Sequence, residues 1–447
     1  MQVALSDHFT YKKIFKITYA PILMVIFVSL YCVIDGLCIA TMAGHDAFAG
    51  ANLIYPIIMI VGGFGFMFGT GGAALTSMHL GEKNKNKANQ TFTNIVLGTL
   101  LLGVVLSLVG FFIIEPIANA LGNITQGTTA GMINEAIKYG RILMICQFAF
   151  MLQNLFQEYF IVAEKPVIGF LFALIAGLTN IIFDLILIGP AQMGVVGAAI
   201  GTVLGFIVGS IGPVIYFFFS KKSTIHFVKP NLDFRSIGRS AYNGSSEFIN
   251  NVATSIISVV FNIQILKYYG QIGVEAYGII MYVILIFIGV YIGYSVGIGP
   301  AISYHYGAKN KEELHNLFKK SLVIVGTASI LMIILGESLA RPIALIFSNG
   351  DSNLINLTTH AMRVWAISFF FCGSSMFVSS FFTALNNGLL SALTAFIRTL
   401  VFQISCVLIF PIFMKGDGIW WSIVIAEGLS FIFALFLLIK SRKRYGY

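Results

Sequence analysis

Charged residues are scarce in this chain of 447 residues, where Asp, Glu, Lys and Arg together make up 10%. A soluble chain of this length normally carries about 25% charged residues. Apolar residues make up 57% of the chain, and the mean hydropathy is +0.89. This composition favours a protein that crosses a membrane many times.

The chain also has little that would indicate a disulfide framework, a metal centre or an enzyme. All five cysteines lie within apolar segments, which is typical of buried thiols. The seven histidines are scattered, with no metal-ligand spacing and no partner for a catalytic triad. We therefore expect no enzymatic activity, no metal site apart from a transported ion, and no cofactor.

Twelve apolar segments are long enough to span a membrane as helices, since one span needs about 20 residues. The fold class is therefore predicted to be all-α integral membrane. The expected helices are 17–41, 53–80, 91–114, 137–162, 168–188, 195–219, 242–267, 275–304, 321–345, 361–385, 389–413 and 418–440.

Most of the 27 basic residues lie in alternate connections between these segments. The positive-inside rule makes that side cytoplasmic, so both termini are expected inside the cell. A nucleic-acid-binding protein would instead gather its basic residues on a soluble face, so no nucleic-acid partner is expected. The residues are Lys12, Lys13, Lys16, Lys83, Lys85, Lys87, Lys165, Lys221, Lys222, Lys229, Arg235, Arg239, Lys309, Lys311, Lys319, Lys320, Lys440, Arg442, Lys443 and Arg444.

An internal repeat relates the two halves of the chain. GGAALTSMHLGEKNK at 71–85 is matched by GIGPAISYHYGAKNK at 297–311, at a constant offset of 226 residues. Six spans per half put both copies in the same orientation, which predicts a pseudo-twofold axis along the membrane normal and a binding cavity between the halves. We place a six-helix bundle at 1–225 and a second at 226–447. A weaker echo pairs Ile133, Asn134 and Arg141 with Ile355, Asn356 and Arg363.

Two carboxylates and an amide lie at membrane depth in the first half. Asp35 lies late in the first segment, and Asp184 lies in the fifth, one helical turn after Asn180. An acid at this depth costs about 2.5–3.5 kcal/mol, which favours a function over a purely structural contact. These side chains offer oxygen ligands for Na⁺, or a carboxylate that takes up and releases a proton. We predict a cation-coupling site at Asp35, Asn180 and Asp184, although Asn180 alone could equally hold helices together.

The fourth segment carries a polar stripe that should face the interior of the bundle. Asn154, Gln157 and Glu158 of this stripe are candidates for a substrate or ion pathway. Glu158 could line the substrate cavity or meet Asp184. The alternative, a residue at a helix end beside the following charged loop, has equal weight.

Three charged residues lie in apolar segments of the second half. Glu247 follows Ser245 and Ser246, so it is either a first-turn acid behind a serine cap or a substrate ligand. Glu427 lies deep in the last segment and Arg398 in the middle of the eleventh. An arginine at that depth needs an acid, and Glu427 is a candidate partner. All three are candidates for the substrate or ion pathway.

With these residues in hand, the chain resembles the multidrug and toxic compound extrusion (MATE) family, and most of all its bacterial DinF-like and MepA-like branch. The resemblance covers nearly the whole chain and rests on the order and spacing of several stretches. They are LYCVIDG, GTGGAALTSMHLGEKN, YFIVAEKP, TNIIFDLILIG with MGVVGAAIGT, NGSSEF, AYGIIMYV through GPAISYHYGAKN, and GIWWSIVIAE.

The resemblance implies a twelve-helix antiporter that expels amphipathic, often cationic compounds in exchange for Na⁺ or H⁺. It also implies a monomer surrounded by lipid in the bacterial plasma membrane. By position, Asp35 matches the cation-site acid of the first helix, and Asn180 and Asp184 match its partners. Glu247 matches an acid of the seventh helix that is proposed to handle substrate or ion in some members.

The sequence departs from the family pattern in two places. Gly299 stands where many members have glutamine. The acid of the fourth helix lies one position away from Glu158 in related proteins, nearer Gln157, which puts the role of Glu158 in doubt. The acids are also not duplicated between the halves. The stretch of the seventh segment that matches Asp35 in the repeat contains only Phe261 and Asn262. We therefore expect ion coupling in the N-terminal half.

Three other functions compete with drug efflux. A lipid-linked oligosaccharide flippase of the wider superfamily would need a basic cavity for pyrophosphate, whereas the deep charges here are mostly acidic, with Arg398 the main exception. A membrane-embedded enzyme such as a lipid transferase would need a clustered catalytic set near one interface. A passive channel would give only downhill, uncoupled flux.

Overall fold

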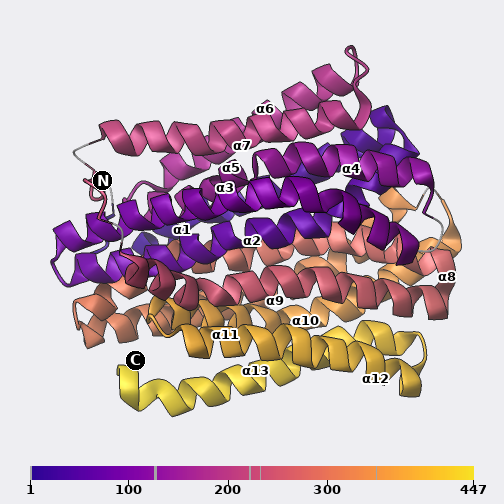
Figure 1. Ribbon diagram of the computed structural model, residues 1–447. Helices are drawn as coiled ribbons and strands as arrows, with labels where there is room; N and C mark the ends of the chain where they lie inside the picture. The colour runs from indigo at the N-terminus through magenta and orange to yellow at the C-terminus, as the bar shows by residue number, and fades with distance from the viewer. Residues whose placement is uncertain (1–2, 125–127, 221–222, 232, 349) are drawn as a thin grey trace.

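The computed structural model describes residues 3–124, 128–220, 223–231, 233–348 and 350–447. Over these residues the regular structure is entirely helical, and the long helices run nearly parallel (Figure 1). Lys221 and Lys222, two of the basic residues counted for orientation, lie outside the described residues.

The first half contains seven α-helices and one π-helix among the described residues. In chain order these are α1 (Tyr11–Cys38), η1 (Ile39–Ala43), α2 (His45–Gly81), α3 (Lys85–Ile124), α4 (Ala130–Ile145), α5 (Gln147–Val162), α6 (Pro166–Ile188) and α7 (Gly194–Phe219). The second half is built in the same way. Its elements are α8 (Phe234–Gly307), α9 (Lys311–Phe347), α10 (Ser352–Ala384), α11 (Gly388–Phe396), η2 (Ile397–Gln403), α12 (Ile404–Met414) and α13 (Asp417–Tyr445).

In the described part of the chain, these elements form the twelve membrane spans that the sequence predicts. Ten helical stretches are long and apolar enough to cross a membrane, and one of them, Ser245–Gly307, has 63 residues. A straight helix of that length would reach about 95 Å, three times the thickness of the hydrocarbon core, so it must turn back. It does so at Gly270, where φ is 64° and ψ is −154°. The twelfth span is α4 with α5, which break at Cys146.

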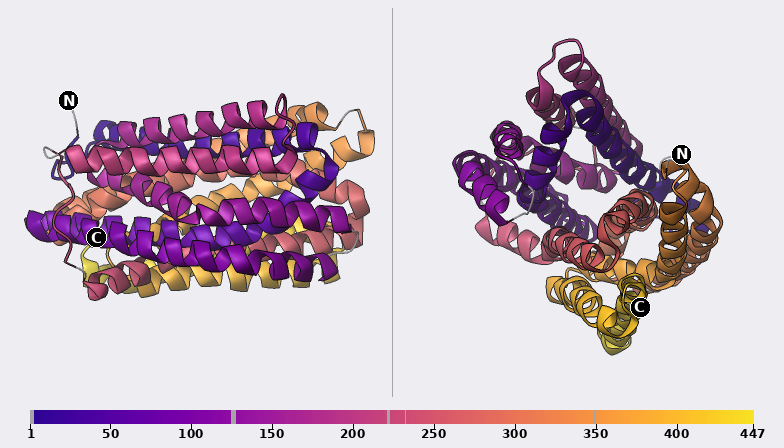
Figure 2. Two further views of the ribbon diagram at one scale, coloured as in Figure 1. Left: turned by 45° about the horizontal axis from the view of Figure 1, so that its top comes forward. Right: turned by 90° about the vertical axis from the view of Figure 1, so that its right-hand side faces the viewer.

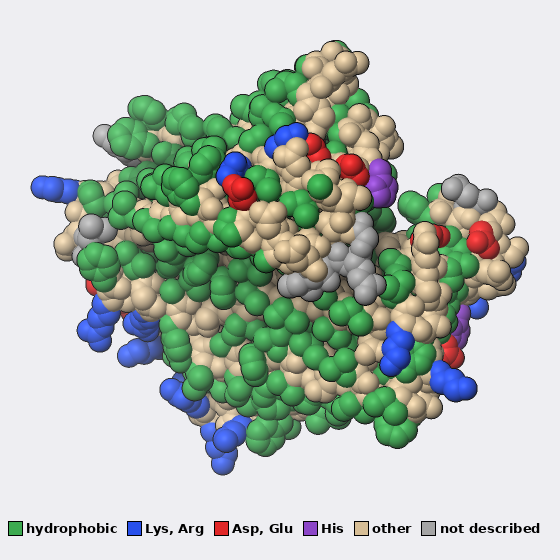
Figure 3. Space-filling view, turned by 45° about the vertical axis from the view of Figure 1, so that its right-hand side comes forward, with side chains coloured by type: hydrophobic (Ala, Val, Ile, Leu, Met, Phe, Trp, Pro, Cys, Tyr) green, Lys and Arg blue, Asp and Glu red, His purple; other side chains and the backbone are tan. Residues whose placement is uncertain are grey.

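The outer face of the bundle carries the apolar pattern of a lipid-facing surface. On α3, Leu101, Val105, Leu108 and Phe112 are all more than half exposed. Their spacing of four, three and four residues places them on one face of the helix. Figure 3 shows hydrophobic side chains over much of the visible flank, with lysine and arginine along its left and lower edges. An apolar face turned outward indicates contact with lipid tails and not with water.

The repeated glycines are contact points between the two halves. A Cβ atom on Gly81 would lie 2.0 Å from the carbonyl oxygen of Tyr304, and one on Gly307 would lie 2.1 Å from that of Met78. These two glycines are related by the 226-residue offset, and each lets one half approach the backbone of the other. Viewed end-on, α8 lies between the first helices and the last ones (Figure 2).

The weaker echo corresponds to an ion pair that both halves contain. Arg141 on α4 pairs with Glu115 on α3, and Arg363 on α10 pairs with Glu337 on α9 at 3.7 Å. Both pairs are about half exposed, so each contributes little to stability, on the order of 0–1 kcal/mol. Their equal placement indicates that the two halves share a scaffold.

The two termini lie at the same end of the bundle (Figure 1). Residues 3–10 precede α1 and pack against both halves. The amide of Leu5 donates to Glu164 Oε1 at 2.7 Å, and the amide of Phe9 donates to Glu313 Oε1 at 2.8 Å. The side chains of Leu5 and Phe9 are fully buried, so this segment is part of the folded protein and not a free tail.

Candidate functional site

The three polar residues predicted for cation coupling meet between α1, α6 and α7. Asn180 Nδ2 donates to Asp184 Oδ2 at 3.0 Å and to Thr202 Oγ1 at 3.2 Å. The Asp35 side chain lies against both Asp184 and Asn180. Asn180 and Asp184 are buried, and Asp35 is half-buried. The structure therefore brings together all three predicted residues and adds Thr202, which the sequence analysis missed.

Each member reaches the cluster through the geometry of its own helix. Asn180 and Asp184 share a face of α6 because they are four residues apart. Asp35 lies in the last turns of α1, just before the π-helix η1, and its carbonyl accepts a hydrogen bond from the amide of Ile39. Such π-turns occur often at functional sites.

Two glycines on α7 make room for the cluster. A Cβ atom on Gly201 would lie 2.2 Å from Asp184 Oδ1, and one on Gly205 would lie 3.3 Å from Asn180 Cβ. They are one helical turn apart, so α7 presents a flat strip to the polar face of α6. Even alanine at Gly201 would push against the carboxylate.

The cluster leaves three acceptor oxygens without a donor. Asp35 Oδ1, Asn180 Oδ1 and Asp184 Oδ1 are buried and accept no hydrogen bond from the described residues. An unsatisfied buried polar atom costs about 1–3 kcal/mol, and more if it is charged. Hard cations prefer oxygen ligands of this kind, and a proton on one carboxyl would also satisfy its neighbour. These residues therefore fit a bound Na⁺ or an exchangeable proton.

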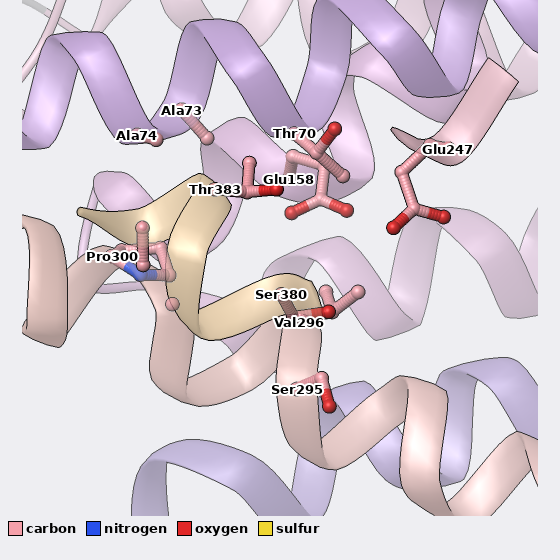
Figure 4. A pocket seen from close by; sticks show the side chains of 12 residues that line it. Thr70, Ala73, Ala74, Glu158, Glu247, Ser295, Val296, Pro300, Ser380 and Thr383 are labelled. Atoms are coloured by element: carbon pink, nitrogen blue, oxygen red, sulfur yellow. The ribbon is translucent and has the colours of Figure 1, made fainter. Parts of the chain in front are cut away.

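A second pair of acids faces a small hollow between the halves. Glu158 on α5 and Glu247 on α8 line a cavity of about 40 Å³, together with Thr70 of α2 and Ser295 of α8. Figure 4 shows both carboxylates pointing into this space. The structure places Glu158 opposite Glu247 and not beside Asp184, because it projects from α5 toward Gly69 of α2.

The capped helix start considered for Glu247 is wrong. α8 begins at Phe234, where Asp233 caps it by accepting from the amide of Arg235. Ser246 instead shares a 3.3 Å hydrogen bond with Thr383. Glu247 therefore lies several turns inside the helix, because the helix begins at Phe234 and not at the expected residue 242.

The other two candidates of the fourth span lie outside these cavities. Asn154 is buried, and its Nδ2 has no hydrogen-bond acceptor among the described residues. Gln157 is half-buried. Neither is among the residues that line the hollow of Glu158 or the larger cavity of the second half.

A larger cavity of about 340 Å³ is lined by residues of the second half together with Phe66 of α2. Its apolar wall includes Phe261, which is stacked on Tyr277 with ring centroids 5.8 Å apart, and Trp365. Its polar residues include Arg398 and Glu427, which form the predicted ion pair, with Nη2 to Oε1 at 2.8 Å. Glu247 lines this cavity as well as the smaller one.

The ion pair depends on an element that the sequence analysis did not foresee. Gln403 Nε2 donates to Glu427 Oε1 at 2.8 Å, beside Arg398. Residues five apart lie about 140° apart around an α-helix but share a face in the wider π-helix. Because η2 covers Ile397–Gln403, both donors point to one carboxylate on α13. Nothing in the local sequence of Ile397–Gln403 predicts a π-helix.

The chain is similar to known proteins over nearly its whole length. A family model described as MatE matches residues 21–186 and 248–409. The multidrug export protein MepA of Staphylococcus saprophyticus is 25% identical over 427 residues, covering 93% of this chain and 90% of that protein. The protein of the same name from Staphylococcus aureus strain MRSA252 is 24% identical over 419 residues, covering 93% and 90%.

Solved structures establish the fold. A MATE protein in complex with MaL6 superposes with a TM-score of 0.90 at 20% identity, covering 98% of this chain and 97% of that chain. An outward-facing MATE family transporter of the MOP superfamily superposes with a TM-score of 0.89 at 20% identity, again covering 98% and 97%. The predicted fold class, twelve membrane helices in two related bundles, is confirmed.

Proposed function

The chain belongs to the MatE family of membrane transporters, and from that premise we propose that it is a secondary active exporter of amphipathic, often cationic compounds. We propose that entry of Na⁺ or H⁺ drives this export. One observation carries the proposal: the three buried, unsatisfied oxygens of Asp35, Asn180 and Asp184. Relatives named multidrug export proteins support the substrate class.

Coupling follows from the charge on this cluster. Asp35 and Asp184 lie against each other in a buried site, so their mutual repulsion is relieved only when a cation or proton arrives. In this proposal neutralisation bends α1, which already carries Pro21 and Gly36, and so shifts the balance between the inward- and outward-open states. Exchange requires that ion and substrate bind different states.

The substrate path in this proposal runs between the two bundles, residues 1–225 and 226–447. Glu158 and Glu247 place negative charge there, which suits a cationic substrate. We place the chain as a monomer in the bacterial plasma membrane, with both termini inside. The basic connections near the two termini support this orientation.

Dye efflux from vesicles with an imposed Na⁺ or pH gradient tests the proposal. We expect Asp35→Asn and Asp184→Asn each to abolish gradient-driven efflux, because each variant lacks one of the two carboxylates whose repulsion the ion relieves. Asp46→Asn is the matched control, since Asp46 is an exposed acid in the first turn of α2. Wild-type efflux by both site variants would falsify ion coupling at this cluster.

The same vesicle assay distinguishes the flippase alternative from drug export. It requires a cavity that attracts pyrophosphate, whereas the interface hollow is lined by two acids. Movement of a lipid-linked oligosaccharide, with no gradient-driven dye efflux, would favour the flippase. Efflux that never runs uphill would favour a passive channel.

A further inference from the structure

The large cavity of the second half has two chemically different ends. Phe261, Tyr277 and Trp365 form a cluster of aromatic rings with centroids 5.8–6.1 Å apart. Arg398 and Glu427 bring full charges into the same cavity from η2 and α13. A volume of about 340 Å³ lies in the range of small-molecule sites. This combination suits an aromatic ligand that also carries polar groups.

Glu427 is fully engaged and is not a free ligand for a cation. Its Oε1 accepts from Arg398 Nη2, Arg398 Nε and Gln403 Nε2 at 2.8–3.1 Å, and its Oε2 accepts from Arg398 Nε at 3.0 Å. The side chain is 2% exposed. Its role is to hold the guanidinium group in one orientation.

Arg398 has one terminal nitrogen that Glu427 does not use. Its Nε and Nη2 are used by Glu427, and Nη2 also approaches Cys372 Sγ at 3.3 Å. All hydrogen bonds of Arg398 within the described chain leave from Nε or Nη2, and the residue lines the cavity. A guanidinium oriented by a buried acid and still offering N–H groups is a receptor for a carboxylate or carbonyl oxygen.

Glu247 supplies the opposite charge in the same cavity. It lies on α8 beside Asn250, and both residues line the cavity. With Arg398 balanced by Glu427, the cavity carries the surplus negative charge of Glu247. A ligand that satisfies both ends has a cationic group for Glu247 and an oxygen acceptor for Arg398.

We propose that the cavity of the second half binds aromatic zwitterions, with the ligand carboxylate on Arg398 and its cationic group toward Glu247. This assignment rests on the proposed export function and adds the residues that would recognise the two charged groups of such a substrate. Gln403 and Glu427 are positioning residues that orient Arg398. The cluster of Phe261, Tyr277 and Trp365 packs against the aromatic body.

A matched pair of dyes tests the assignment. The probes are a rhodamine with a free benzoate, which is a zwitterion, and its methyl ester, which is a cation. Their dissociation constants are measured with the purified full-length protein by fluorescence polarisation. We expect the wild-type protein to bind the free acid about tenfold more tightly than the ester, as one charge-assisted hydrogen bond allows.

Variants at the pair separate recognition from folding. Arg398→Gln together with Glu427→Gln keeps neutral hydrogen-bonding groups and avoids an unpaired charge. We expect this double variant to lose the preference for the acid. Arg398→Lys keeps the charge but loses the planar pair of N–H donors of the guanidinium group. The preference for the free acid over the ester should therefore fall only in part. Arg363→Gln with Glu337→Gln is the matched control at an exposed pair and should keep the preference.

The outcomes distinguish this inference from the proposed function. A wild-type protein that binds both dyes equally, or a double variant that keeps the preference, overturns the inference. If the double variant does not fold, an unchanged preference in Arg398→Lys overturns it. If the preference is found and then lost as expected, but neither dye is exported from vesicles under a gradient, the inference stands and the proposed export fails.

Discussion

At the scale of single residues, the candidate ion site depends on a missing side chain as much as on its acids. Asp184 can turn Oδ1 toward α7 only because Gly201 has no Cβ. Asn180 then bridges Asp184 and Thr202 with one amide nitrogen. The unsatisfied oxygens follow from this close packing, since α7 excludes water from the carboxylate.

Gly201→Ala tests this dependence. We expect gradient-driven dye efflux to fall at least tenfold, because the new Cβ would lie 2.2 Å from Asp184 Oδ1 and displace the carboxylate. Gly326→Ala on α9 is the control, because a Cβ there meets nothing within 4 Å. The control should gain up to about 1 kcal/mol in stability from better helix propensity. Equal efflux in the two variants would contradict the packing argument.

The buried pair of Arg398 and Glu427 makes a second prediction at this scale. We expect Glu427→Gln to lower the free energy of unfolding by about 3–5 kcal/mol, because it leaves a buried guanidinium unpaired. Adding Arg398→Gln should restore part of that loss. Thermal unfolding in detergent measures the cycle. The same cycle at the exposed pair of Arg141 and Glu115 should give only about 0–1 kcal/mol, and similar values at both pairs would refute the argument.

At the scale of elements, π-helices and a short N-terminal segment position the charged side chains described above. The π-helix η1 directly follows the last turn of α1, which carries Asp35, and the π-helix η2 contains Arg398. The segment 3–10 is a further example, because it crosses from Glu164 in the first half to Glu313 in the second. Glu313 also accepts from His8 Nδ1 at 2.6 Å and from Asn316 Nδ2 at 2.7 Å.

Glu313→Ala should release this segment. The change removes the acceptor for the amide of Phe9 and for the ring of His8, so on α9 the segment keeps only the hydrogen bonds that the carbonyl of Phe9 accepts from Asn316 and Lys320. We expect faster tryptic cleavage at Lys12 and Lys13 in folded protein. Glu312→Ala is the matched control, because Glu312 is the exposed neighbour on the same helix. Unchanged cleavage in Glu313→Ala would show that other contacts hold the segment.

At the scale of the whole molecule, two halves with one scaffold carry different chemistry. The duplicated glycines and the duplicated Arg–Glu pair belong to the scaffold. The acids Asp35 and Asp184 belong to the first half, whereas Phe261 in the second half is stacked on Tyr277. Asn262 donates only to the carbonyl of Ser258 in its own helix. The cluster of Asp35, Asn180 and Asp184 therefore lies in the first half, whereas the aromatic cavity is lined by the second half apart from Phe66.

The shared interface predicts equal effects for related positions. Gly81→Val and Gly307→Val should each separate the halves at the end near the termini, because each Cβ would lie 2.0–2.1 Å from a carbonyl oxygen of the other half. We expect both to lower the unfolding temperature and dye efflux by similar amounts. Gly278→Val is the control, since nothing lies within 4 Å of a Cβ there. Strongly unequal effects would argue against a pseudo-twofold interface.

The sequence by itself determined the membrane class, the twelve spans, the repeat and the presence of two acids, Asp35 and Asp184, at membrane depth. These properties are local or periodic: apolar runs of span length, one helical turn between Asn180 and Asp184, and a motif copied at a constant offset. The same reasoning correctly gave Arg398 an acidic partner, because an arginine at membrane depth requires one.

Only the tertiary structure decided which polar groups meet across helices. It paired Glu158 with Glu247 across the interface, placed Thr202 and Gln403 in the two clusters, and carried α8 back to Asp233, so that Glu247 is not a first-turn acid. Which side chains of two neighbouring helices face each other depends on the rotation of each helix about its own axis. A single π-turn changes that rotation. No local pattern in the chain records that rotation.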